Sequence, residues 1–305
     1  MAAIRAGFSD LLAPGFLNIF RQNQDIKQYP EEYSKYLKVE GSDRQFEEEN
    51  IVTGFGSAME KEERASVQYD DPFQGTKKRY THITYALGFR ISEELWEDDL
   101  YGAMKAMPGE LSFSLRDVTE VVSAGILING FTDSAAYRGP DGEPLFGDGT
   151  TKDHPLLGGG RAANQLSVAS DLNVDSLEAL LILMADTVND QGLLAGLKGR
   201  LLIVPTELQF QAKQLLESEL EAYVANNQVN PFDGMDLKYF VGHYLTDPDA
   251  FFLQAQKHYM KHLWRKRAAM ANDDDFDTGD AKFKGRQRSI NGYTDWRGIS
   301  ASPGA

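Results

Sequence analysis

Two histidines give the first spacing in this chain that could bind a metal ion. His258 and His262 lie four positions apart, which on a helix would place both on one face, as in zinc-binding pairs. The residues between them supply no general-base glutamate, and Lys257, Lys261 and Arg265 would repel a cation. We therefore expect a packed or solvated helix or strand face here, and no metal.

The acidic run over residues 273–280 invites comparison with a calcium-binding loop. If Asp273 were the first ligand, the required glycine would fall on Thr278 and the bidentate glutamate on Lys284. The pattern fails at both positions. Because basic residues flank the run on both sides, we expect a solvated loop or one that pairs with basic residues of this chain or a neighbouring chain.

Phosphate-binding and nucleophile motifs are also incomplete. No stretch matches the P-loop, and the run beginning Gly158-Gly159-Gly160 fits dinucleotide spacing only with alanine as its last residue and without a preceding strand. Ser123 is followed by Gly125, but Val121 stands where a nucleophile elbow requires its first glycine. The sequence therefore predicts no catalytic residue and no cofactor, and a protein that is not an enzyme.

Composition narrows the possible classes further. The 305 residues carry a formal net charge of −15, which argues against sequence-independent nucleic-acid binding through Lys and Arg. Zero cysteines exclude disulfides and thiolate metal sites. No apolar stretch reaches the roughly 18 residues of a membrane span, and the first ten residues lack a signal-peptide pattern. We expect a soluble intracellular product without membrane contact.

A long β excursion is predicted near the N-terminus. Residues 83–91 alternate between apolar and polar positions, residues 51–59 do so more weakly, and the charged stretch 60–78 separates them. An isolated two-stranded ribbon is marginally stable, so this element needs a surface to lie on. Residues 1–49 carry aromatic residues without a clear period and are expected to form an arm that packs on another surface.

A long amphipathic helix is predicted from Pro108, because apolar residues recur every three or four positions until Asn129-Gly130 closes it. Residues 131–165 form a glycine-rich loop of a length typical of functional or mobile loops.

Residues 166–255 have the pattern of an α/β block. The expected elements are a helix with a capping box of Asp175 and Glu178 that ends at Gly192, a strand at 201–204, a helix capped by Thr206 and Gln209, a strand at 237–241 and, after the turn 246–249, the segment 250–253.

Several short motifs occur in a fixed order: Asp141-Gly142-Glu143-Pro144-Leu145-Phe146, His154-Pro155-Leu156 with Asn164, Leu202-Ile203-Val204-Pro205, Asn230-Pro231, Tyr244-Leu245-Thr246-Asp247, and Gly292-Tyr293-Thr294-Asp295-Trp296-Arg297-Gly298. Together with the order of the predicted elements, these motifs resemble the major capsid protein of tailed bacteriophages over roughly residues 50–300. The amino-acid sequences of the motifs are similar to those of the Mu-like major head subunit group.

This resemblance implies the α+β tailed-phage major capsid fold. Its parts would be an N-arm (1–49), an extended β E-loop (50–91), a P domain with a long spine helix and the glycine-rich loop (92–165), an α/β A domain (166–255), and P-domain return strands with the C-terminus (256–305).

The resemblance also implies a structural function: a shell subunit that self-assembles into hexamers and pentamers of an icosahedral head around double-stranded DNA, without sequence-specific binding. Implied partners are other copies of the chain, a portal protein, a decoration protein and, because no long cleaved segment precedes the arm, a separate scaffold protein. The protein would be part of the virion and be assembled in the host cytoplasm. A shell would also give the arm and the β excursion neighbouring surfaces to cover.

Eight residues are the predicted inter-subunit contacts: Phe16, Phe20, Tyr69, Phe73, Lys77, Lys78, Trp296 and Arg297. Some members of the family crosslink through lysine, and Lys77 and Lys78 lie near the predicted tip of the excursion, but we favour surface salt bridging for both. Trp296 is expected to be a core or interface anchor, and Arg297 to pair with Asp295 or a nearby carbonyl.

Two alternatives stay open at this stage. An encapsulin-type nanocompartment shell shares the fold and encloses protein cargo, and neighbouring portal, protease and terminase genes would favour the phage instead. An acidic cytoplasmic α/β hydrolase or ligand-binding protein would place its site in the loop 139–160 and be a stable monomer that binds a small molecule.

Overall fold

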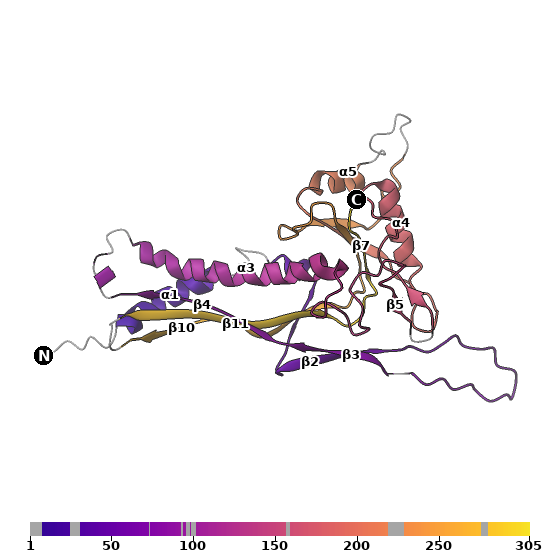
Figure 1. Cartoon of the computed structure of the whole chain (residues 1–305), viewed down its shortest axis with the longest axis horizontal. Coiled ribbons are helices and arrows are strands. Elements are labelled where there is room, and N and C mark those ends of the chain that lie inside the picture. The colour runs from indigo at the N-terminus through magenta and orange to yellow at the C-terminus, as the bar shows by residue number, and fades with distance from the viewer. Residues whose placement is uncertain are drawn as a thin grey trace.

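The computed structural model consists of an elongated part and an upright block at one end of it (Figure 1). It describes residues 8–24, 31–72, 74–92, 94–95, 98, 102–156, 159–218, 229–275 and 280–305. The long helix α3 (Met107–Ile128) lies along a sheet in the elongated part, and a two-stranded ribbon projects past the foot of the upright block.

The other helices are α1 (Phe8–Asn23), η1 (Tyr33–Lys35), η2 (Ala103–Ala106), η3 (Asn129–Phe131), α4 (Val174–Ala185) and α5 (Gln209–Glu217). The strands are β1 (Lys38–Gly41), β2 (Phe46–Val52), β3 (Gln74–Thr81), β4 (Ile83–Ile91), β5 (His154–Pro155), β6 (Arg161–Ala162), β7 (Gly199–Val204), β8 (Lys238–Val241), β9 (Phe251–Ala255), β10 (Met260–Asp274), β11 (Ala281–Tyr293) and β12 (Ile299–Ser302).

The sheet of the elongated part has the strand order β1-β10-β11-β4. Its centre is the long antiparallel hairpin β10–β11, with β4 antiparallel on one side and β1 parallel on the other. The buried face of β11 packs under α3, where Gln287 Nε2 donates to Leu115 O at 2.7 Å and to Thr119 Oγ1 at 2.9 Å. Gly285 allows this close approach, because a Cβ there would lie 2.6 Å from Leu115.

Helix α1 packs on the same face of this sheet. Phe16 contacts Phe283 with ring centroids 5.2 Å apart, and Phe20 is buried with Leu111 and Leu115 of α3. Side chains of α1 thus complete the hydrophobic core under α3.

The upright block is built on the sheet β12-β9-β7-β8. Alternate residues of β7 face opposite ways: Leu202 and Val204 belong to the core formed with α4 and α5. Ile203 belongs to a second core with the end of α3 and the segment after η1. The sheet is therefore covered on both faces, and all five residues of β9 are buried.

The predicted long helix and the strands of the α/β block are confirmed, but the second limb of the β excursion is not. The ribbon pairs β2 with β3, from Phe46 opposite Thr81 to Val52 opposite Gln74. The strongly alternating stretch 83–91 is β4 of the long sheet, paired with β11. Period-two alternation indicates a strand with two unlike faces, but it does not identify the neighbouring strand.

Both predicted helix caps are wrong. Helix α4 begins with Asn173 as its N-cap, whose side chain accepts from Ser176 N at 2.8 Å, and it ends at Ala185, before Gly192. Helix α5 has Leu208 as its N-cap without a side-chain cap, while Thr206 Oγ1 bonds Glu207. Several cap-forming residues precede each helix, and tertiary packing decides which of them is used.

Candidate functional site

The ribbon is an antiparallel strand pair whose facing side chains are largely charged. Glu47, Glu48 and Glu49 on β2 face Tyr80, Arg79 and Lys78 on β3 in the antiparallel register. The Arg79 guanidinium lies 2.6 Å from Glu48 Oε1 and holds the pKa of that carboxyl below its usual range. Both side chains are exposed, so this ion pair contributes little to stability.

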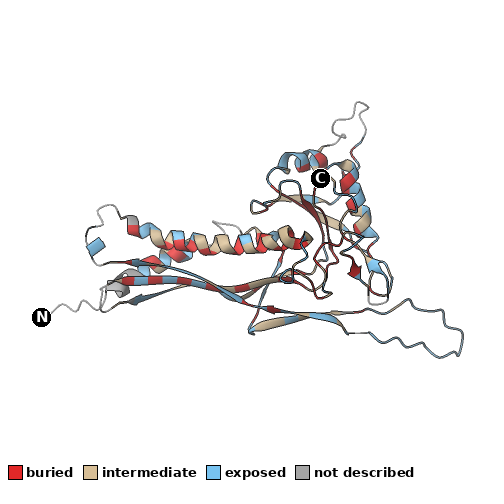
Figure 2. Ribbon diagram, in the orientation of Figure 1, coloured by how far each residue is buried: buried red, intermediate tan, exposed pale blue. Residues whose placement is uncertain are grey.

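Residues 53–72, here called the ribbon loop, extend from the ribbon without regular secondary structure (Figure 2). Tyr69 is 89% exposed, and Phe55, Met59 and Val67 are also exposed. A hydrogen bond from Gly56 N to Asp70 Oδ2 at 2.8 Å joins the two sides of the loop. This loop exposes large apolar side chains far from the hydrophobic cores, which marks it as a candidate contact element.

The base of the ribbon is anchored in the chain. Tyr80 Oη donates to Tyr293 O at 2.6 Å and accepts from Tyr293 N at 3.2 Å. Its ring packs against Gly292, where a Cβ would lie 2.6 Å from Tyr80. Glu49 adds contacts with Lys261 at 2.9 Å and with Thr294 Oγ1 at 2.7 Å. The ribbon therefore leaves the body of the protein from a fixed point.

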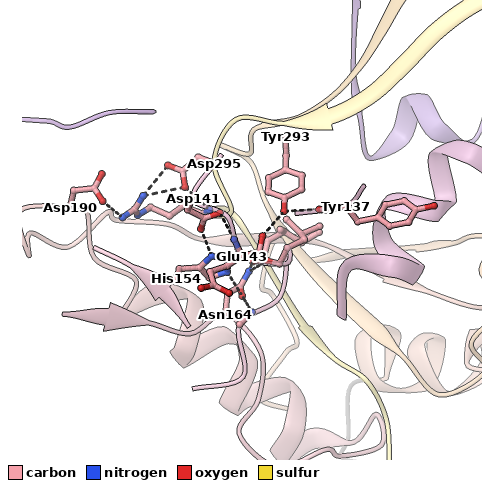
Figure 3. Close-up of polar contacts among 12 residues, drawn as sticks. Tyr137, Asp141, Glu143, His154, Asn164, Asp190, Tyr293 and Asp295 are labelled. Atoms are coloured by element: carbon pink, nitrogen blue, oxygen red, sulfur yellow. Dashed lines mark hydrogen bonds and ion pairs between the residues drawn. The ribbon is translucent and has the colours of Figure 1, made fainter. Parts of the chain in front are cut away.

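The glycine-rich segment after α3 is a buried polar junction (Figure 3). His154 is fully buried, its Nδ1 lies 2.6 Å from Asp141 Oδ2, and its ring stacks on Trp296 with centroids 4.4 Å apart. Asn164 Oδ1 accepts from Gly147 N at 2.7 Å, and Asn164 Nδ2 donates to two backbone carbonyls. We call His154, Asn164, Trp296 and their partners the junction.

Arg297 links the junction to the upright block. Its Nε donates to Val188 O at 2.8 Å, Nη2 donates to Asp190 at 3.0 Å, and Nη1 donates to both Asp295 oxygens at 3.1 Å. The guanidinium also lies 4.8 Å from the centre of the Trp296 ring. The expected pairing of Arg297 with Asp295 is confirmed.

A second buried polar cluster holds the segment after α1 against the long helix. Glu120 of α3 is 3% exposed, and its two oxygens accept from Glu32 N at 2.9 Å and Tyr33 N at 3.0 Å. Burial is the main cause that raises the pKa of Glu120 to about 7, and the carboxylates of Glu31 and Glu32 add to it. Glu32 in turn accepts from His243 N at 3.0 Å.

Seven of the eight predicted contact residues fall into three groups, and Lys78 is described below. Phe16, Phe20, Trp296 and Arg297 are buried within their own chain, so in this conformation their side chains leave almost no area for a neighbour. Tyr69 and Lys77 are exposed on the ribbon loop and on β3. Phe73 lies outside the described residues.

Neither lysine of the predicted tip lies there. Lys77 and Lys78 belong to β3 opposite β2, and the turn is made by the ribbon loop. Lys78 Nζ donates to the carbonyls of Ala136 and Arg138, and burial lowers the pKa of Lys78. Lys78 is thus engaged within its own chain, and inter-subunit salt bridging by Lys77 stays a prediction.

The histidine pair does not share a helix face. His262 lies on β10 and His258 precedes that strand, and burial lowers the pKa of each to about 4. Within the described part of the chain, no three His, Cys, Asp or Glu side chains are grouped so that they could hold a metal ion. No described helix is long and apolar enough to cross a bilayer.

Sequence reasoning missed Glu120 and Tyr80. Glu120 stands among the apolar positions of an amphipathic helix, where a charged residue is a weak signal of burial. Tyr80 lies between the predicted polar tip, which ends at residue 78, and the alternating stretch 83–91. The contacts of both residues are with residues far away in the sequence, which local sequence patterns do not reveal.

Comparison with known proteins identifies the family. The family model described as phage capsid protein matches residues 75–301. Among curated proteins, no match to the chain was found.

Solved structures share the fold at low sequence identity. The capsid of a native GTA particle aligns with a TM-score of 0.60 and 11% identity, over 89% of each chain. A structure from Mycobacterium phage Adephagia gives 0.58 and 9%, again over 89% of each chain. The holo-SrpI encapsulin complex from Synechococcus elongatus PCC 7942 gives 0.51 and 9%, over 90% of this chain and 86% of that chain.

The α+β architecture expected from the sequence is thus confirmed as the tailed-phage capsid fold. The family match covers well over half of the chain and includes the long helix, the upright block and the hairpin β10–β11. This chain belongs to the phage capsid protein family, and its function is that of a capsid shell protein.

Proposed function

We propose that this shell protein assembles into hexamers and pentamers of a closed icosahedral head around double-stranded DNA, and that it belongs to the Mu-like group of head subunits. The observation that carries the assembly step is the ribbon loop, which exposes Tyr69, Phe55 and Met59 at a distance from the hydrophobic cores of the chain. In a monomer, apolar side chains on an extended loop stay exposed and contribute little to stability. Between the subunits of a shell they would be buried.

We assign the parts of the shell subunit by resemblance to the family. The ribbon and its loop would act as the E-loop, α3 with the long sheet as the P domain, and the upright block as the A domain gathered at the capsomer axis. The ribbon spans residues 46–81, so the E-loop begins and ends earlier than the range 50–91 expected from the sequence. Phe16 and Phe20, which were expected to belong to an N-arm reaching a neighbour, pack on the long sheet and α3 of their own chain.

Portal and scaffold proteins are the further partners that we propose, with a decoration protein as an optional addition, and assembly would take place in the host cytoplasm. The subunit would act without catalysis, as a component of the virion. The DNA would be enclosed without sequence-specific contacts, consistent with the net charge of −15.

Negative-stain electron microscopy of the purified protein, with light scattering after size-exclusion chromatography, tests the proposal. Shells, tubes, sheets or rings of five and six subunits are expected, alone or after co-expression with a scaffold protein from the same genome. Monomers under all of these conditions would contradict it.

A loop deletion sharpens this test. Replacing residues 58–68 by two glycines keeps the Gly56–Asp70 hydrogen bond and both ribbon strands. The variant should unfold at the same denaturant concentration as the wild type but form no shells. Normal shells from this variant would show that the ribbon loop is not the contact element.

An encapsulin-type shell is the second candidate, because an encapsulin shares the fold. The contents of the particles separate the two: nuclease-protected DNA supports the phage head, and a co-purified protein cargo without DNA supports the nanocompartment.

A further inference from the structure

Three carboxylates meet where the upright block lies against the long helix. Glu120 belongs to α3, whereas Glu31 and Glu32 belong to residues 31–37, here called the linker segment, which directly precedes β1. Glu32 also faces the upright block, because it accepts from His243 N at 3.0 Å and lies 2.6 Å from His243 Nδ1. One acidic cluster thus joins the long helix, the linker segment and the upright block.

The members of this cluster differ in how firmly they are held. Glu120 is buried, and its two oxygens accept from the N–H groups of Glu32 and Tyr33. The side chain of Glu32 is 23% exposed and that of His243 is 68% exposed, so both have access to water. If like charges in the cluster repel each other, the contact between Glu32 and His243 is therefore the one that yields.

The cations of the cluster belong to the linker segment's two carboxylates. Arg267 of β10 lies 3.5 Å from Glu31, and His243 lies beside Glu32. Among the residues that the structure describes, no cation forms an ion pair with Glu120. A charge on Glu120 is thus buried close to two other carboxylates, which like-charge repulsion disfavours.

Four further titratable or charged side chains surround Glu120, from its own helix, the linker segment and the upright block: Arg116, Asp117, Tyr36 and Tyr244. Arg116 donates to Asn23 O at 3.3 Å. Burial raises the pKa of both tyrosines, so they stay neutral near pH 7. Glu120, whose pKa burial raises to about 7, is therefore the buried carboxyl of this cluster that changes its charge near neutral pH.

The apolar core beneath the cluster does not depend on this charge. Ile203 and Phe252 of the upright block pack with the end of α3, and Gln254 Nε2 donates to Tyr36 O at 2.7 Å. The upright block therefore stays attached whatever the state of Glu120. A change in the cluster is confined to the linker segment and to the turn after β8 that carries His243.

We propose that this cluster is a proton-dependent latch between the linker segment and the upright block. With a proton on Glu120, Glu32 keeps both of its contacts with His243, and the latch is closed. When Glu120 loses the proton to water, its charge stays fixed on the two N–H groups and repels the Glu32 carboxylate, which turns to solvent and releases His243.

The sign of the pH dependence follows from proton linkage. The closed latch binds the proton of Glu120 more tightly than the open latch does, so closing is favoured in acid and is lost as the pH rises through 7. This switch is a property of the single subunit and is independent of the proposed assembly.

Amide hydrogen exchange of the full-length protein tests the latch, because His243 N donates to Glu32 only when the latch is closed. The measured quantity is the protection factor of this amide, which corrects for the intrinsic effect of pH on exchange, after millisecond labelling and mass spectrometry. It should fall about tenfold between pH 6 and pH 8. The amides of β9, which lie in the covered sheet, are the internal reference and should not change.

Two variants identify the group that titrates. Glu120→Gln removes the charge at every pH and keeps the size of the side chain, so protection of the His243 amide should stay constant within about twofold. Glu32→Gln removes the carboxylate that is repelled, at a partly exposed site, and should also abolish the fall. Glu110→Gln is the matched control, since it removes a carboxylate from the exposed side of the same helix and should keep the tenfold fall.

Three results would overturn the inference. Equal protection of the His243 amide at pH 6 and pH 8 in the wild type would show that no latch opens. An equal fall in the wild type and in Glu120→Gln would assign the pH dependence to another group, such as the imidazole of His243. A fall that includes the amides of β9 would indicate general unfolding of the upright block. Because exchange is measured on the chain whether or not it forms shells, each result stands apart from the outcome of the assembly tests.

Discussion

The ribbon and the junction are both rich in polar contacts, but they are stabilised differently. The ribbon pairs Glu48 with Arg79 in water, where an ion pair contributes little. The junction buries His154, Asn164 and Arg297 with their hydrogen-bond partners inside the protein. Removing one partner from such a buried group costs several times more than breaking an exposed pair.

This difference separates two tasks of the subunit. The junction fixes the glycine-rich segment and the upright block to the end of the long helix, so substitutions there should impair folding. The ribbon loop contributes little to the stability of its own chain and exposes side chains for a neighbour. Substitutions there should impair assembly while the subunit stays folded.

The largest expected effect comes from removing the indole of the junction. Trp296→Ala should lower the free energy of unfolding by about 3–5 kcal/mol, because the ring is buried between His154 and Arg297 and leaves a cavity. Denaturant titration followed by circular dichroism measures it. Phe210→Ala, which removes an aromatic ring that is 77% exposed on α5, should stay within about 0.5 kcal/mol of the wild type. Equal losses of unfolding free energy in the two variants would show that the buried ring of the junction contributes no more to stability than an exposed ring.

Glu120 tests whether burial of a single carboxyl makes folding depend on pH. Burial raises its pKa to about 7 from 4.5, so between these values the folded chain binds a proton that the unfolded chain does not. Its contribution is therefore complete below pH 4.5 and is lost as the pH rises to 7, about 3 kcal/mol in all.

Glu120→Gln removes this titration. The stability of the wild type relative to Glu120→Gln should fall by about 3 kcal/mol between pH 4.5 and pH 8, measured by urea unfolding at each pH. His258 and His262 titrate equally in both proteins and cancel in the difference. Parallel pH profiles would show that Glu120 does not titrate in this range.

A smaller effect is expected where the ribbon joins the body. Gly292→Ala would place a Cβ 2.6 Å from the Tyr80 ring, which its own hydrogen bonds hold in place, and should cost about 1–3 kcal/mol. Gly41→Ala is the matched control, since a Cβ there meets nothing within 4 Å. A thermal melt of both variants gives the comparison, and a neutral Gly292→Ala would mean that the ribbon base is adaptable.

The smallest effect on stability is expected at the tip of the molecule. Tyr69→Ala should change the free energy of unfolding by less than about 0.5 kcal/mol, because the side chain is 89% exposed. Assembly, followed by light scattering, should nevertheless weaken, and Tyr69→Phe should preserve it. A variant that assembles normally would remove Tyr69 from the contact.

Much of the architecture could be predicted from local patterns. The spacing of Leu111, Leu115 and Ile126 defines one apolar stripe, and the helix appears where that stripe predicts it. Alternation identified β4 as a strand but not as a partner of β11, because strand pairing depends on residues far away in the chain.

The polar sites were less accessible to sequence reasoning. The two motifs that contain Asn164 and Trp296 were visible, yet nothing in them indicated that His154 would stack on Trp296. Lys282, Lys284, Arg286 and Arg288 formed one block of basic charge in the sequence, without any sign that the residues between them would be buried. Only the burial of alternate residues under α3 separates the two faces of β11.

The parallel pairing of β1 with β10 has a consequence for the synthesis of the chain. The two central strands of the long sheet, β10 and β11, are the last of that sheet to leave the ribosome, whereas the edge strands β1 and β4 are made early. A chain that stops before residue 260 therefore has two edge strands and nothing to pair them with. Because such long-range pairing cannot begin until translation is nearly complete, truncated products cannot form this sheet, and only full translation yields a subunit fit to enter the shell.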